Sequence, residues 1–72
     1  MTLQQILDKE RQHRCEGGMY GITACKDSIK WYADNGENLY MLLGEYVDRA
    51  NRDVFFNRAM VLACWELINE EA

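Results

Sequence analysis

Few side chains in this sequence could bind a soft metal ion, namely His13, Cys15, Cys25 and Cys64. Zinc sites are usually built from two close pairs of such ligands, and here only His13 and Cys15 lie close together. On a helix these two side chains diverge, so His13 is poorly placed to activate the Cys15 thiol as a nucleophile. We therefore expect no catalytic residue and no zinc site, and we expect Cys25 and Cys64 in the core.

Glu45 and Asp48 are a second candidate for chemistry, because they lie three residues apart and share one face if the segment is helical. Two carboxylates on one helix face can hold Mg²⁺ through bound water. Solvent-exposed helix faces commonly carry such pairs without any metal. We expect no cofactor, and Mg²⁺ at Glu45 and Asp48 is the alternative interpretation.

The elements that position these residues are predicted to be helices, since apolar residues recur every three or four positions in four segments. Thr2 and Gln5 have the spacing of a capping box, and Asn38 and Asp53 are suited to cap two later helices. The predicted helices run from Leu3 to about Arg14, from about Met19 to Ala33, from Leu39 to Ala50 and from Val54 to Glu71.

The composition predicts a single folded domain over residues 1–72. Hydrophobic residues make up 49% and charged residues 28% of the chain, which excludes a disordered tail of low hydrophobicity and high net charge. No segment alternates with the period of a strand, and there is no proline. We expect an all-α fold, a small antiparallel bundle of about four helices.

The last predicted helix is apolar almost all the way round from Val54 to Ile68, whereas a helix on the surface of a domain normally has one apolar stripe. A chain of this length buries only roughly 60% of its unfolded surface. We therefore expect a second copy to cover this helix in a homodimer. The predicted interface residues are Phe55, Phe56, Met60, Val61, Trp65 and Ile68.

Twelve acidic against eight basic residues leave a net charge of −4, which disfavours binding to a nucleic-acid backbone. Neither a signal peptide nor a run of about 20 apolar residues is present, so no membrane contact is expected. Three cysteines without a regular spacing suggest reduced thiols. These features predict a cytoplasmic protein whose partners are a second copy and another protein.

Three segments, residues 6–12, 42–50 and 59–68, occur in an order that resembles short MazG-like nucleotide pyrophosphohydrolases. The resemblance implies an all-α, self-associating scaffold in which a Glu-Glu-x-x-Glu helix and a second acid pair hold magnesium. Here only Glu45 falls on a ligand position of the first motif, where Tyr46 and Arg49 replace the other two acids and Asp48 is one place out of register.

The second acidic motif of that family should lie near the start of the last helix, and it is also missing. This chain has Val54, Phe55, Asn57 and Arg58 there, and an arginine repels a cation. The resemblance therefore implies a degenerate member that keeps the scaffold and has lost the metal site.

Taken together, these features predict a non-catalytic protein that acts by protein–protein interaction. Its small size and acidity resemble phage or prophage accessory proteins that bind and inhibit a host enzyme or defence complex. One alternative is a residual Mg-dependent MazG-like hydrolase, with Glu45 and Asp48 as ligands and Lys30 or Arg49 meeting phosphate. Another is a structural subunit of a larger complex.

Overall fold

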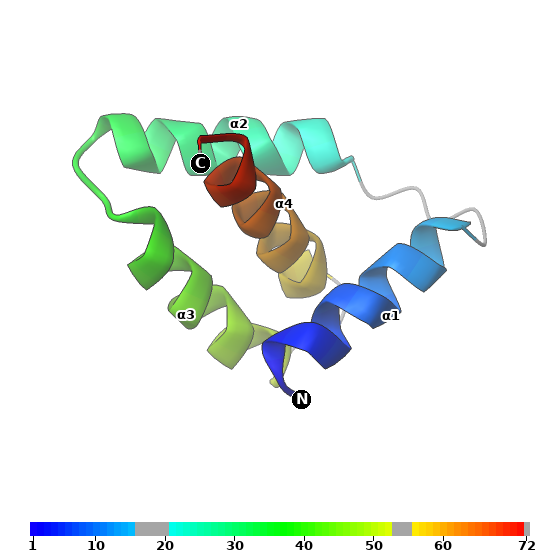
Figure 1. Cartoon of the computed structure of the whole chain (residues 1–72). Helices are drawn as coiled ribbons and strands as arrows, with labels where there is room; N and C mark the ends of the chain where they lie inside the picture. The colour runs from blue at the N-terminus through cyan, green and yellow to red at the C-terminus, as the bar shows by residue number, and fades with distance from the viewer. Residues whose placement is uncertain (16–20, 53–55, 72) are drawn as a thin grey trace.

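The computed structural model describes residues 1–15, 21–52 and 56–71. Over these residues it contains no strand and four helices: α1 (Leu3–Cys15), α2 (Ile22–Asp34), α3 (Leu39–Ala50) and α4 (Phe56–Glu71) (Figure 1). The predicted all-α bundle of four helices is confirmed, and the third helix has the predicted bounds. Met19 and Asp53, the predicted start of the second helix and cap of the last, lie outside the described residues.

Side-chain caps fix the starts of two helices. At α1 the Thr2 amide donates to Gln5 Oε1 (2.9 Å) and the Gln5 amide donates to Thr2 Oγ1 (3.3 Å), which is the predicted capping box. At α3 the Asn38 Oδ1 accepts from the amides of Tyr40 (2.9 Å) and Met41 (3.2 Å). The two caps satisfy backbone amides that have no partner within their own helix.

Replacing Asn38 with alanine is expected to lower the free energy of unfolding by about 1 kcal/mol, because the first amides of α3 lose their acceptor. Urea unfolding followed by circular dichroism measures this loss. Asn38→Asp is the matched control, since a carboxylate caps equally well. An equal loss in both variants would contradict a capping role.

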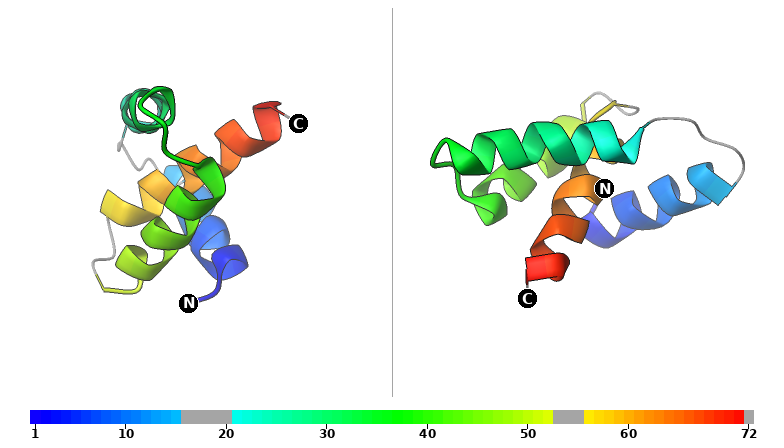
Figure 2. Two further views of the ribbon diagram at one scale, coloured as in Figure 1. Left: turned by 90° about the vertical axis from the view of Figure 1, so that its left-hand side faces the viewer. Right: turned by 90° about the horizontal axis from the view of Figure 1, so that it is seen from above.

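Helix α4 lies at the centre of the fold. It packs against α1, α2 and α3, and α1 also meets α3. The helices α2 and α3 diverge from the turn that joins them, and α4 passes between them (Figures 1 and 2). Of the buried apolar residues in the described part of the chain, half belong to α4, at positions 59–64, 67 and 68. The other three helices of the same chain therefore enclose α4.

A buried ion pair joins α1 to α4. The Glu10 side chain is 1% exposed and the Arg58 side chain 11%, and Arg58 Nε lies 3.5 Å from Glu10 Oε2. Burying a charge is costly unless an opposite charge accompanies it. The contact between Glu10 and Arg58 therefore offsets part of the cost of burying both charges.

Candidate interaction surface

The two acids considered as magnesium ligands both lie on the exposed face of α3. Asp48 Oδ2 is 3.5 Å from Arg52 in an exposed ion pair one helical turn away. Among the described residues, no group of three His, Cys, Asp or Glu side chains is close enough together to hold a metal ion. The geometry of this face is that of a solvated helix surface.

Two of the three cysteines lie in the core as free thiols, as predicted for Cys25 and Cys64. Burial raises the pKa of the Cys64 thiol to about 11, and its Sγ donates to the Leu39 carbonyl oxygen (3.2 Å). At neutral pH this thiol stays protonated, and the thiolate is the nucleophilic form. Cys64 thus has a packing role against the start of α3. His13 is half-buried, and the side chain of Cys15 is outside the described residues.

Three of the six residues predicted to form a dimer interface on the last helix lie inside the single chain. Met60, Val61 and Ile68 are buried in its core, and Trp65 is half-buried and packs against that core. Phe55 and the side chain of Phe56 lie outside the described residues. The premise that α4 needs a second copy to cover it does not hold, because three helices of the same chain cover it. Self-association itself stays a prediction.

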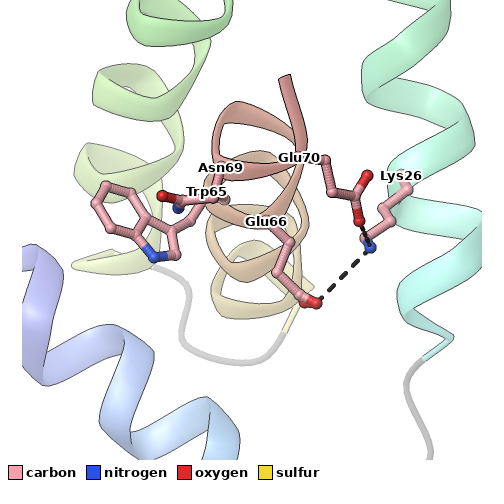
Figure 3. A network of polar contacts seen from close by, with 5 residues as sticks. All are labelled: Lys26, Trp65, Glu66, Asn69 and Glu70. Carbon is pink, nitrogen blue, oxygen red and sulfur yellow. Dashed lines mark hydrogen bonds and ion pairs between the residues drawn. The ribbon is translucent and has the colours of Figure 1, made fainter. Parts of the chain in front are cut away.

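The remaining edge of α4 is polar and faces α2. Lys26 Nζ lies 2.8 Å from Glu70 Oε1 and 3.7 Å from Glu66 Oε1, whereas Trp65 and Asn69 point to the other side of the helix (Figure 3). The hydrogen bond between Lys26 and Glu70 raises the pKa of Lys26 and lowers the pKa of Glu70. Both shifts favour the charged pair, which ties the end of α4 to α2.

Four exposed large apolar residues lie in the last turns of α2 and the first turn of α3. Trp31 is 61%, Tyr32 40%, Tyr40 69% and Met41 73% exposed, and Met1 is the one other large hydrophobic residue that is exposed within the described residues. The connection between the helices is only residues 35–38, so these four residues lie close along the chain to the turn that joins α2 to α3 (Figure 1). We call these four residues the α2–α3 corner.

The α2 side of this corner contains a hollow of about 340 Å³ that is open to solvent. It is lined by Asp27, Ser28, Trp31 and Tyr32. The Trp31 and Tyr32 rings meet edge to face, with centroids 5.3 Å apart and planes at 81°, an arrangement that aromatic pairs favour. The hollow therefore combines aromatic surface with a carboxylate and a hydroxyl group.

Tyr32 also connects the corner to the core. Burial raises the pKa of Tyr46, and the nearby Tyr32 adds to this shift. The Arg49 guanidinium lies over the Tyr46 ring, 5.6 Å from its centroid, at a distance typical of a cation–π contact. Tyr32 thus meets the exposed Trp31 ring and lies near enough to Tyr46 of α3 to influence its pKa.

The helix stripes of the sequence contain a signal for the α2–α3 corner. Trp31 lies off the stripe formed by Ile22, Cys25 and Ile29 in α2. Tyr40 and Met41 likewise lie off the stripe of α3 formed by Leu39, Leu42, Leu43 and Tyr46. Large apolar residues off the stripe of an amphipathic helix point to solvent or to a partner.

No protein-family model matches the sequence, and we found no match among curated proteins or solved structures. In the described part of the chain, no helix is both long enough and apolar enough to cross a membrane.

Proposed function

We propose that this protein binds another protein through the α2–α3 corner. The observation that carries the proposal is that Trp31, Tyr40 and Met41 are each more than 60% exposed. Tryptophan, tyrosine and methionine are enriched at protein interfaces, and truncating a central aromatic there often costs 2 kcal/mol or more of binding free energy, on the order of a thirtyfold loss of affinity.

The fold fixes the position of the backbone that carries these side chains. Both helices that carry them pack on α4, and the Asn38 cap bonds the amides of Tyr40 and Met41 themselves. Gly36, with φ of +97°, adopts the left-handed conformation that the turn between the helices requires. A preformed surface loses little conformational entropy on binding, which favours affinity.

The role we propose is non-catalytic. Arg58 occupies a position where the resemblance to MazG-like enzymes leads one to expect an acid, and here it pairs with Glu10 in the interior. Asp48, near the other expected ligand position, pairs with Arg52 in solvent. These contacts support a scaffold without a metal site, whose activity is to occupy the surface of a target such as a host enzyme.

Site-specific photo-crosslinking in the source cell tests this proposal. A photoreactive amino acid at position 40 is expected to yield a discrete adduct of higher mass, and Trp31→Ala in the same chain is expected to reduce it strongly. The control carries the photoreactive residue at position 9, which is exposed on α1. Equal adducts from positions 9 and 40, or none from position 40, would contradict binding through the corner.

A further inference from the structure

Resting on this proposed function, we infer that the α2–α3 corner binds a basic segment of its partner protein. In this arrangement an arginine guanidinium lies on the Trp31 ring and pairs with Asp27.

Trp31 lies between two carboxylates on the exposed side of α2. Asp27 precedes it by four residues and Asp34 follows it by three, so the three side chains form one stripe along the helix. All three are exposed. Within the described parts of the chain, neither Asp27 nor Asp34 forms an ion pair. The stripe therefore presents an aromatic face together with two negative charges that are open to a partner.

The nearest positive charge on the same helix is Lys30. Its charge acts on Glu70 of α4, where it helps to lower the pKa of that carboxyl. Lys26, one turn earlier, is held by Glu66 and Glu70. Lys26 is therefore held toward α4. Lys30 lies three residues after Asp27 and four before Asp34 and so borders the acidic stripe, but it forms no ion pair with either carboxylate in the described part of the chain.

An arginine side chain matches this combination better than other groups. Its planar guanidinium stacks on an indole ring while its N–H groups donate to a carboxylate, and it is more weakly hydrated than a lysine ammonium. Ser28 adds a hydroxyl group at the wall of the hollow. Phosphate groups of a nucleic acid or an anionic lipid would be repelled by Asp27 and Asp34.

The probe is a peptide of alternating glycine and arginine, titrated into the labelled full chain and followed by two-dimensional NMR. We expect saturable shifts of the Trp31 indole N–H and of the amides from Asp27 to Tyr32. The matched peptide with citrulline, which is neutral and nearly isosteric, is expected to cause none. Binding should weaken as salt is added, because the charges are exposed.

Two variants of equal charge separate this site from the general acidity of the chain. Asp27→Asn is expected to weaken the arginine peptide about threefold, as for an exposed ion pair, and Trp31→Ala about two- to fivefold. Asp8→Asn on α1 removes the same charge from an exposed position and is expected to leave the affinity unchanged. Equal weakening by Asp27→Asn and Asp8→Asn, or binding of the citrulline peptide, would overturn the inference.

The crosslinking experiment distinguishes failure of this inference from failure of the proposed function. If the adduct at position 40 is undiminished in Asp27→Asn, the partner binds the corner without an arginine at Trp31 and Asp27. That result contradicts the inference and leaves the proposed function standing. If no adduct forms, the proposed function falls whatever the peptide does. A weaker adduct in Asp27→Asn but not in Asp8→Asn supports both.

Discussion

Glu10→Gln is expected to destabilise the folded protein by about 3 kcal/mol, because it removes the negative charge that faces Arg58 in the interior. The two side chains are almost fully enclosed, with 3.5 Å between Arg58 Nε and Glu10 Oε2. A domain of this size has a total stability of roughly 4 to 11 kcal/mol, so the variant loses a large share of it. Thermal and urea unfolding followed by circular dichroism measure the loss.

The control for this prediction removes both charges. In the double variant Glu10→Leu/Arg58→Met no charge is left buried, and such replacements are often neutral or stabilising. It is therefore expected to recover most of the loss. Asp48→Asn, which removes half of an exposed ion pair with Arg52, should leave the unfolding midpoint unchanged. A double variant as unstable as Glu10→Gln would show that the pair is not the cause.

Met60→Ala is expected to lower the free energy of unfolding by about 2 to 5 kcal/mol, because Met60 is 3% exposed within the core and its truncation leaves a cavity. Met41→Ala makes the same chemical change at a side chain that is 73% exposed, and its expected effect on unfolding is within about 0.5 kcal/mol. Urea unfolding of both variants gives the comparison directly.

The same pair of variants separates packing from self-association. A residue buried within one chain destabilises that chain equally at every protein concentration, whereas a residue between two copies makes the unfolding midpoint concentration-dependent. We therefore expect the loss in Met60→Ala to be independent of concentration over a dilution series, with light scattering giving the mass at each point. If the loss of stability in Met60→Ala grew on dilution, Met60 would instead belong to a dimer interface.

The helices were largely predictable from local chemistry. The bounds of α3 follow from the Asn38 cap and from the regular stripe that ends at Ala50, and both are properties of neighbouring residues. The start of α1 follows in the same way from Thr2 and Gln5. The core positions of Cys25 and Cys64 were also correct, since a small apolar side chain on a stripe has few other places to lie.

The sequence could not show what covers α4. The apolar residues all round this helix predicted burial on several sides, and burial is confirmed for Met60, Val61 and Ile68. Which surface provides the cover depends on the angles at which the helices cross, and periodicity within each helix contains no information about them. The pairing of Arg58 with Glu10 joins residues that are 48 positions apart, so no local spacing could reveal it.

The central position of α4 also determines when this chain can fold during synthesis. The first three helices share few contacts with one another, and each packs mainly on residues 56–71. Short helices are marginal in water without a packed face. A nascent chain that has emerged only as far as α3 therefore lacks the surface on which to assemble, and it must wait for α4 to leave the ribosome. The four helices then assemble together once α4 is available, and until that point the apolar stripes of the first three are open to chaperones.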